Sequence, residues 1–538
     1  MDKQSNEIEH YVWAERIADE LAAKKKKEYV LHGMWTPSGF FHIGNSRAEL
    51  MIPHFVAKAL GEKGIKSRQN FIVDDFDDFD KIPAGVNVDK EEFSKYLGMP
   101  LREVPSPVEG HESWAHYFRH EVISAMDDFG IKPNILSSYD SYKKGLYDEA
   151  IKIVLDKAEK AREIWNEITN AKKPKGWLPV MVVCENCGKS CTTKAISWDG
   201  TYIEYTCNQE KDYAKPCRHK GRVKPEKGAA KLPWRLHWAA GWYIHKVTFE
   251  SAGKDHHSAG GSVQTSQAFI KEIFNSEGPM QPLTEFLLLD NAKLSGSSGN
   301  VISLRDWLQF AEPELLRFMM ASYKPSTVIN FDLHSNKFFL LADRFDNAEK
   351  AYFSNSEEKR DRQLTEIYKY AQITIPKEMP AQLNYSNAVM IVQTFPNKKL
   401  DEIIEKIHAS GWIQKKILME YDKARLEKRL RLARNWLGKY APEDVKFTVQ
   451  NDVPESLKLL PKEKEALHLL AASLEKKEWD EQSLFNEFYN ICEETGIKNT
   501  DFFRAAYNVL LNKDRGPKLA PFILTLGREK AISLFEKV

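Results

Sequence analysis

A histidine, a glycine and an asparagine stand close together in the stretch SGFFHIGNSR, residues 38–47. Residues 28–35, EYVLHGMW, predict a short buried strand before it, and residues 46–64 predict an amphipathic helix after it. The N-terminus of a helix offers free N–H groups and the positive end of its dipole to phosphate. His42 can therefore donate a hydrogen bond to a phosphoryl oxygen, and Gly44 lets a nucleotide approach the backbone. The competing interpretation is a histidine that only satisfies its own loop.

A second candidate is the loop AKLSGSSGN, residues 292–300, which follows the apolar strand pattern FLLLD. Its backbone amides and the hydroxyls of Ser295 and Ser297 can bind polyphosphate, and Lys293 adds a mobile positive charge. The order of glycine and lysine differs from that of a Walker loop. A flexible surface turn is the alternative.

A third candidate is the loop AGKDHHSAGGS, residues 252–262, which concentrates polar residues and glycines. Its acid, Asp255, can accept a hydrogen bond from a ribose hydroxyl or from an ammonium group. The alternative is an ordinary helix start, which Asp255 or Ser262 would cap.

Five of the six cysteines fall within residues 184–217, which indicates a local metal site in a reducing compartment. Cys184 and Cys187 have the spacing that lets two sulfurs face one tetrahedral Zn²⁺. The other half of the site is irregular, and the alternative is an eroded zinc finger with free thiols. We predict Cys207 and Cys217 as the remaining ligands, with Cys191 and His219 as competitors for the fourth position.

Composition limits the class of protein. Of 538 residues, 42% are hydrophobic and 29% charged, as in an ordinary globular protein of several domains. The net charge of +1 argues against a global attraction to nucleic acid or to an anionic membrane, so any basic surface must be local. The sequence contains neither an apolar run long enough for a membrane span nor the apolar core of a signal peptide. We therefore expect a cytoplasmic protein without a membrane segment.

The elements that carry these residues follow a strand–helix–strand order. Residues 65–80, IKSRQNFIVDDFDDFD, predict a second strand that ends in carboxylates, and such a βαβ unit predicts a parallel sheet. Helical patterns fill roughly 110–128 and 143–172. From about residue 305 onward strand signals almost vanish and helical spacing dominates, which predicts an all-α C-terminal domain.

Five stretches, taken in order, resemble the motifs of one enzyme class: TPSGFFHIGN, IVDDFDDFDKIP, KLPWRLHW, FESAGKDHHSAGGS and KLSGSSGN. Together they resemble the class I aminoacyl-tRNA synthetases, and most closely the class I lysyl-tRNA synthetases. The resemblance covers about residues 10–330 by motif and the helical remainder by architecture. Three positions depart from the family pattern: Leu294 replaces a methionine, Ser298 replaces the second lysine of the signature loop, and His237 stands where relatives carry an aspartate. We expect Ser298 to reduce assistance to the leaving pyrophosphate without abolishing activity.

The resemblance implies a lysine–tRNA ligase. Such an enzyme activates lysine with ATP and Mg²⁺ and transfers the lysyl group to the 3′ end of tRNA(Lys); we expect a monomer. The implied catalytic residues are His42, Asn45 and Lys293, with Gly44, Gly253, Ser295 and Ser297 also at the ATP. The implied lysine-binding residues are Gly33, Thr36, Asp74, Asp75, Trp234, Asp255 and His256, with Asp74 or Asp75 the favoured acid for the ε-ammonium.

The resemblance also sets the expected architecture: an α/β protein with a Rossmann-like parallel-sheet catalytic domain, a small zinc-ribbon-like insertion and the all-α C-terminal domain. The predicted domains are the N-terminal half of the catalytic domain (1–175), the zinc-binding insertion (176–230), the second half of the catalytic domain with the signature loop (231–305), a connecting helical region (306–350) and a helical anticodon-binding domain (351–538).

Two other functions stay open at this point. One is a glutamyl- or arginyl-type enzyme of the same class. The other is a catalytically weakened, RNA-binding paralogue, which Ser298 suggests. A basic stretch at residues 423–440 suits contacts to tRNA, although a solvated helix face explains its charges equally well.

Overall fold

A computed structural model describes residues 10–294, 301–335, 337–409 and 412–538. The predicted phosphate ligands Ser295 and Ser297, and the variant position Ser298, lie outside the described residues. The chain forms two compact units. The first unit comprises the residues up to Trp307 together with Leu316–Phe331 and Glu357–Thr374; the second comprises Leu308–Leu315, Asp332–Ser356 and Ile375–Val538. Because these units interleave along the chain, the predicted domain limits stay a prediction.

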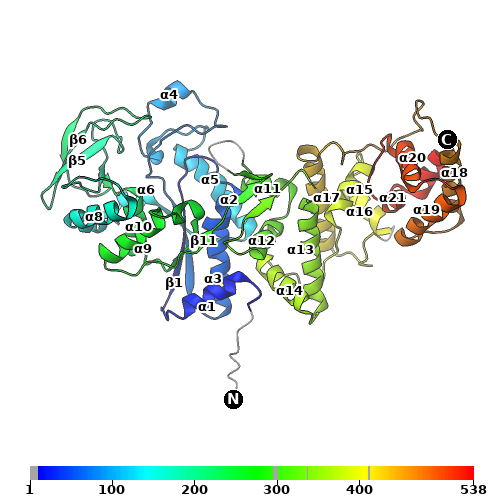
Figure 1. Cartoon of the computed structure of the whole chain (residues 1–538), viewed down its shortest axis with the longest axis horizontal. Coiled ribbons are helices and arrows are strands. Elements are labelled where there is room, and N and C mark those ends of the chain that lie inside the picture. Colours follow the sequence, from blue (N-terminus) through cyan, green and yellow to red (C-terminus); the bar gives the residue numbers. More distant parts are fainter. Residues whose placement is uncertain (1–9, 295–300, 336, 410–411) are drawn as a thin grey trace, which may run out of the picture. The chain divides into compact units, whose positions relative to one another are not determined.

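The first unit is built on a parallel sheet, as the βαβ pattern predicted. Its four strands have the order β3-β2-β1-β9, and each neighbouring pair is parallel (Figure 1). The register of β1 on β2 runs from Tyr29 opposite Ser67 to Trp35 opposite Val73. β1 is buried along almost its whole length, as is typical of a strand covered on both faces. The strands are β1 (Tyr29–Trp35), β2 (Ser67–Val73), β3 (Asn134–Ser137) and β9 (Phe249–Glu250).

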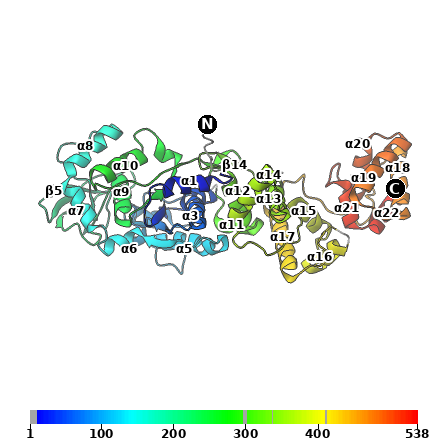
Figure 2. The same ribbon diagram turned by 90° about the horizontal axis from the view of Figure 1, so that it is seen from below.

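The connection from β1 to β2 is helical, as predicted, but it is not one regular helix. It begins with α2 (Ile43–Ser46), continues through a π-helical turn (Arg47–Met51) and ends with α3 (Ile52–Glu62). The proline of α3 lies in its first turn, where a missing N–H costs nothing. The helix α1 (Trp13–Ala22) packs against α3 (Figure 2).

The cysteine-bearing segment forms a small antiparallel insertion. Its entry strand β4 (Met181–Val182) pairs with its exit strand β8 (Ala230–Lys231), so the segment leaves and rejoins the first unit at one place. Between them β5 (Thr193–Trp198), β6 (Ile203–Cys207) and β7 (Lys220–Val223) form a three-stranded sheet.

The first unit contains further helices and short strands besides the four-stranded sheet and the cysteine-bearing insertion. The predicted helix at 110–128 is present as α5 and the one at 143–172 as α7 and α8, and one short strand, β14, lies beyond residue 305 where almost none was expected. The elements are α4 (Lys90–Ser94), α5 (Trp114–Met126), α6 (Ser138–Lys143), α7 (Asp148–Asp156), α8 (Ala158–Thr169), α9 (Trp234–His245), β10 (Ala252–Gly253), α10 (Ser262–Glu272), β11 (Leu283–Thr284), β12 (Leu287–Leu289), β13 (Ala292–Lys293), β14 (Ile329–Phe331) and α14 (Lys359–Ala371), with α11 (Leu304–Phe310) and α12 (Pro313–Ser322) contributing residues to both units.

The described part of the second unit is helical throughout its regular elements, which confirms the predicted all-α C-terminal region. Helices α18 to α22 pack on one another and lie together at the red end of the ribbon in both views (Figures 1 and 2). The helices are α13 (Lys337–Ser354), α15 (Tyr385–Thr394), α16 (Leu400–Ala409), α17 (Glu420–Lys439), α18 (Pro461–Lys476), α19 (Glu481–Thr495), α20 (Asn499–Leu511), α21 (Leu519–Leu526) and α22 (Arg528–Phe535).

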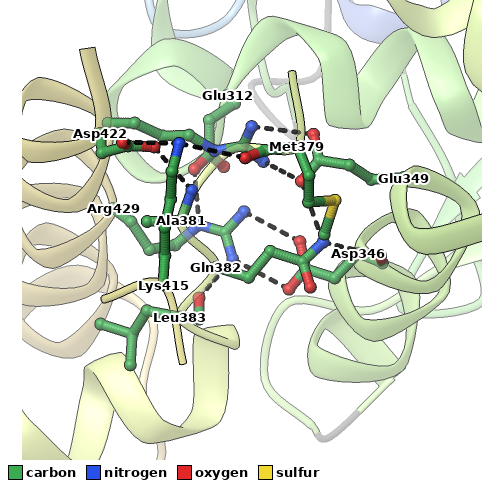
Figure 3. Close-up of polar contacts among 11 residues, drawn as sticks. Glu312, Asp346, Glu349, Met379, Ala381, Gln382, Leu383, Lys415, Asp422 and Arg429 are labelled. Atoms are coloured by element: carbon green, nitrogen blue, oxygen red, sulfur yellow. Dashed lines mark hydrogen bonds and ion pairs between the residues drawn. The ribbon is translucent and has the colours of Figure 1, made fainter. Parts of the chain in front are cut away.

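The basic stretch on α17 is partly internal. Figure 3 shows Arg429 between Glu312 and Asp346, and its Nε lies 2.6 Å from Glu312 Oε1. Arg425 binds Glu349 through two parallel hydrogen bonds of 2.8 Å each. These two cations are therefore used to hold the second unit together. Trp436 on the same helix is also buried, so none of the three forms an exposed face for RNA.

No described helix combines the length and the apolar character that crossing a lipid bilayer requires.

Candidate active site

The carboxyl ends of the parallel strands bring the predicted residues to one edge of the sheet. In parallel α/β sheets this edge is where ligands bind. Thr36 lies in the turn directly after β1, half-buried, with its carbonyl oxygen accepting a hydrogen bond from the Ser38 N–H at 2.8 Å. Asp74 directly follows β2, and Glu250 ends β9.

His42 caps the helix that starts after β1. Its Nδ1 accepts a hydrogen bond from the Asn45 N–H at 3.1 Å, while the Asn45 side chain accepts one from the His42 N–H at 3.2 Å. Burial, together with the nearby charge of Lys293, lowers the pKa of His42 to about 4. An imidazole that is neutral and accepts at Nδ1 carries its proton on Nε2. Asn45 therefore sets the tautomer in which His42 offers a hydrogen bond from Nε2.

Gly44 leaves room for that ring. A Cβ at this position would lie 2.9 Å from His42 Nδ1 and 3.6 Å from a methyl carbon of Leu294. Leu294 is buried, so the leucine that replaces the family's methionine keeps an apolar contact here. The glycine thus serves the histidine as well as any ligand that approaches the backbone.

Lys293 is presented by a hairpin between β12 and β13. Asp290 and Asn291 at its turn have φ angles of 50° and 64°, the left-handed pair that a tight type I′ turn requires. Lys293 Nζ lies 2.7 Å from Asp255 Oδ2 and 4.1 Å from the ring centroid of Phe286. The charge of Lys293 also lowers the pKa of His42, so the two predicted catalytic side chains are close enough to interact electrostatically.

The loop after β9 contributes an open position and an acid. A Cβ at Gly253 would meet no atom of the described residues within 4 Å, so the space beside this glycine is free for a ligand. Asp255 is exposed and forms the ion pair with Lys293. The predicted acid of this loop therefore lies beside the predicted phosphate-binding lysine.

Three aromatic rings form one wall of the edge. Trp234 and Trp238 stack with their ring centroids 5.2 Å apart, and the His256 ring lies 5.6 Å from Trp238 and 6.0 Å from Trp234. Burial lowers the pKa of His256, which favours the neutral ring. The two predicted pocket residues, Trp234 and His256, are thus brought together, and Trp238 joins them.

Gly33 is required by the backbone. A Cβ there would lie 1.9 Å from the carbonyl oxygen of Glu49, so only glycine allows β1 to approach the π-helical turn this closely. The same approach lets the Glu49 carboxylate accept a hydrogen bond from the Met34 N–H at 2.8 Å. Burial raises the pKa of Glu49 to about 8 against the effect of that hydrogen bond, and Glu250 raises it further.

Glu49 and Glu250 were missed by sequence reasoning. Glu250 is fully buried and accepts hydrogen bonds from the indole N–H groups of Trp238 at 3.0 Å and Trp242 at 2.5 Å. Burial raises the pKa of Glu250 to about 7. The sequence did contain a signal for each of these acids. Glu49 lies on the otherwise apolar side of a predicted amphipathic helix, and Glu250 ends an apolar strand.

The two favoured acids after β2 differ in their surroundings. Asp75 accepts hydrogen bonds from the Ser137 hydroxyl and from the Tyr139 N–H, each at 2.8 Å, and so caps α6; burial raises its pKa to about 6. Asp74 is buried, with His237 Nε2 3.7 Å from Oδ1, and burial raises its pKa to about 7 while Lys231 opposes that rise. Asp75 is therefore held by hydrogen bonds within the protein, whereas Asp74 faces a histidine whose pKa is lowered to about 3, so Asp74 remains a predicted acid of this edge.

The four predicted cysteines meet at one point. Their sulfurs all lie within 4.8 Å of one another, with Cys184 to Cys217 at 3.5 Å and Cys187 to Cys207 at 3.8 Å. Four sulfurs at about 2.3 Å from a tetrahedral Zn²⁺ would be about 3.8 Å apart, so the cluster fits this metal. Both competitors for the fourth position lie elsewhere: Cys191 Sγ is 3.9 Å from the Gly98 carbonyl oxygen, and His219 faces Glu185.

Comparisons with known proteins identify the family of the chain. Residues 11–374 match the family model described as tRNA synthetases class I (K), and residues 439–537 match one described as anticodon binding domain. The chain is 36% identical to a lysine–tRNA ligase of Methanocaldococcus jannaschii, which covers 97% of this chain and 100% of that protein. It is 35% identical to a lysine–tRNA ligase of Pyrococcus horikoshii, covering 97% of this chain and 98% of that protein. A glutamate tRNA ligase structure from Elizabethkingia meningosepticum aligns at 12% identity with a TM-score of 0.39, covering 95% of this chain and 99% of that one.

The protonation state of His42 is testable by NMR of ¹⁵N-histidine-labelled protein, with the His42→Gln variant identifying the signal. We expect a neutral ring protonated on Nε2 at neutral pH, and protonation of Nδ1 only near pH 4. Since the unfolded chain takes up this proton near pH 6.5, His42 should lower stability as pH falls from about 6.5 to 4 and have no effect above that window. The Asn45→Ala variant keeps the backbone N–H that donates to Nδ1, so it should keep the ring protonated on Nε2. A charged ring at pH 6 would contradict this assignment.

Proposed function

The chain belongs to the family of class I lysine-type tRNA synthetases and is a lysine–tRNA ligase, and from this premise we propose that the edge formed by β1, β9 and the β12–β13 hairpin is where it activates lysine. The observation that carries the proposal is that Leu294, next to Lys293, approaches Gly44 in the turn that His42 caps, while the same strand–helix connection carries the Glu49 carboxylate at the Met34 N–H. A phosphate site and an ammonium site side by side are what an enzyme that joins lysine to ATP requires.

The activation step forms lysyl-adenylate. The carboxylate of lysine attacks the α-phosphorus of ATP, the bond to the bridging oxygen breaks, and pyrophosphate leaves with the electron pair. Negative charge builds on the phosphate oxygens, where the Nε2–H of His42 is placed to donate a hydrogen bond. Such preorganised donors act mainly on the transition state, which raises the rate. Mg²⁺ bound with ATP would neutralise part of the phosphate charge.

Lys293 is free to change partners during this step. Its ion pair with Asp255 is exposed on both sides, and exposed ion pairs contribute little stability. Exchanging Asp255 for the β- and γ-phosphates therefore costs little, and Lys293 then stabilises the leaving pyrophosphate. Ser295 and Ser297 are proposed to add hydrogen bonds to the same phosphates.

The adenosine is proposed to lie along the two glycine positions of this edge. Gly253 has open space beside it, and Gly44 follows the histidine cap that Asn45 orients. In this arrangement the nucleotide contacts backbone at both positions, so a larger side chain at either would collide with ATP or displace His42.

Glu49 is the carboxylate that we propose for the ε-ammonium of lysine. Asp75 accepts hydrogen bonds from Ser137 and Tyr139, and the charge of Lys231 acts on Asp74, whereas among the described residues no lysine or arginine forms an ion pair with Glu49 or Glu250. Gly33 and Thr36 line the adjoining backbone, and Trp234 and His256 form the aromatic wall for the methylene stem. An acidic pocket of this kind repels glutamate, which disfavours the glutamyl-type alternative.

The second substrate is tRNA(Lys). After activation, the 3′-terminal hydroxyl of the tRNA attacks the carbonyl carbon of lysyl-adenylate and AMP leaves. The match of residues 439–537 to an anticodon binding domain supports recognition of the anticodon by this segment. The cysteine-bearing insertion is proposed to approach the acceptor end.

We also propose that Cys184, Cys187, Cys207 and Cys217 hold one structural Zn²⁺. The sulfur–sulfur distances support this, and so does the Cys217 N–H, whose nitrogen lies 3.4 Å from the Cys207 sulfur, because hydrogen bonds of this kind stabilise a metal-bound thiolate. The metal would hold the two ends of the insertion together, since no disulfide does so among the described residues.

Exchange of labelled pyrophosphate into ATP, measured with each amino acid in turn, tests the function. We expect exchange with lysine alone, and a loss of about a hundredfold or more in kcat/KM for Lys293→Ala, because a charged donor to the transition state is removed. Exchange with glutamate or arginine would instead support the rival enzymes, and no exchange with any amino acid would support an RNA-binding paralogue.

The Glu49→Gln variant tests the ammonium site. Loss of one partner of a buried charge pair should raise the KM for lysine about thirtyfold or more. Because the pKa of Glu49 is raised to about 8, the free carboxyl is protonated at neutral pH and must ionise to bind an ammonium group. The KM for lysine should therefore fall as pH rises from 6 towards 8 in the parent protein, and lose this dependence in Glu49→Gln. Glu92→Gln, on the exposed α4, is the control. An unaffected KM would place the acid elsewhere.

Metal content tests the cysteine cluster. Protein purified with added zinc should contain one Zn²⁺ per chain by elemental analysis, and Cys217→Ser should bind it far more weakly, because a thiolate ligand is lost. Cys191→Ser is the matched control within the same insertion and should retain the metal. Retention by Cys217→Ser together with loss by Cys191→Ser would overturn the ligand set.

A further inference from the structure

Lys231 is a buried cation that the proposed reaction does not use. It ends β8, the exit strand of the cysteine-bearing insertion, and only 5% of the residue is exposed. Its Nζ donates hydrogen bonds to the Phe76 carbonyl oxygen at 2.9 Å and to Asp77 Oδ1 at 3.1 Å. The exit strand of the insertion is therefore attached to the segment that follows β2.

The surroundings of Lys231 are strongly acidic. Burial alone would lower its pKa, but Asp77, Asp78 and Asp74 raise it above the ordinary value of a lysine. Lys231 is thus charged, and it balances a run of carboxylates that burial would otherwise make costly. A neutral side chain at this position would leave that run without its cation.

A second contact ties the insertion to the same run of acids. The Ser190 hydroxyl donates a hydrogen bond to Asp78, and the Ser190 N–H donates one to the Gly98 carbonyl oxygen at 3.1 Å. Ser190 lies in the turn that carries the first cysteine pair. Both the entry and the exit side of the insertion are therefore fastened to the end of β2.

The chain passes from Lys231 directly into the aromatic wall. Two residues separate it from Trp234, the first residue of α9. The intervening Leu232 N–H donates to the Tyr142 hydroxyl at 3.3 Å, and that hydroxyl lies 3.0 Å from His237 Nδ1 on the next turn of α9. Lys231 is thus joined to the first turn of α9 both along the chain and through the contacts of Leu232, Tyr142 and His237.

We propose that Lys231 is a positioning residue that couples the cysteine-bearing insertion to the lysine pocket by fixing the first turn of α9 and with it Trp234. The coupling rests on the proposed function, in which Trp234 lines the pocket for the methylene stem of lysine. On this basis the KLPW segment (residues 231–234) is a mechanical link: its lysine is held by the acids after β2, and its tryptophan contacts the substrate.

The Lys231→Met variant tests the link in the full chain. We expect the KM for lysine in pyrophosphate exchange to rise about tenfold or more, the loss that follows removal of a charged hydrogen-bond donor. The KM for ATP should stay within about twofold, since His42 and Lys293 are on other elements. Hydrogen exchange should accelerate in the peptide covering the first turn of α9, and bound zinc should stay unchanged. Lys231→Arg should restore part of the lysine affinity, and Lys194→Met, at an exposed position of β5, is the control.

An equal rise in the KM for ATP and for lysine, or faster hydrogen exchange across the whole chain, would mean that Lys231 only stabilises the fold. Either result would overturn the proposal. An unchanged KM for lysine with unchanged exchange in α9 would do the same. If Lys231→Met does not fold, the Ser190→Ala variant is measured instead. A rise in the KM for lysine without a rise in the KM for ATP would support the coupling, and an unchanged KM for lysine would refute it. If the parent protein showed no lysine-dependent pyrophosphate exchange, the proposed function would be wrong. The coupling would still be tested by the rate of amide hydrogen exchange in α9.

Discussion

The active edge depends on how closely β1 approaches the helical segment that follows it. At Gly33 the two backbones come so near that a Cβ would lie 1.9 Å from the Glu49 carbonyl oxygen. This approach brings the Glu49 carboxylate to the Met34 N–H, and the same connection starts with His42 as its cap. The proposed ammonium site and the proposed phosphate site are therefore two ends of one strand–helix connection, and a shift of that connection would move both.

Buried carboxylates in the first unit fall into two groups that differ in their partners. The acids after β2 face an internal ammonium group, that of Lys231, which is held in place permanently. Glu49 and Glu250 have no such cation among the described residues, and burial raises the pKa of each. A buried carboxylate without a cation is costly to a fold. The presence of such carboxylates beside the aromatic wall therefore supports the proposal that this pocket binds a cationic ligand.

Charge in the second unit shows why a basic sequence is not the same as a basic surface. Arg425 and Arg429 lie on the helical stretch whose composition suggested contacts to RNA, yet their guanidinium groups bind Glu349, Glu312 and Asp346 in the interior. The charges that α17 keeps for solvent belong to its other face. Recognition of tRNA by this unit must therefore use residues beyond that pair.

Strand periodicity, helix-start chemistry and short ligand spacings are local properties of the chain. They were therefore enough to predict the parallel strand–helix order, the family and the clustering of the four cysteines. The assignment of His42 and Lys293 to phosphate stays a prediction. The hydrogen bonds that each buried carboxylate accepts, which separate Glu49 from Asp75, and the position of Lys231 among acids far away in sequence became visible only in the folded chain. A pattern reports that a residue is buried, whereas the charge and hydrogen bonds that meet it come from other elements and are set when those elements pack.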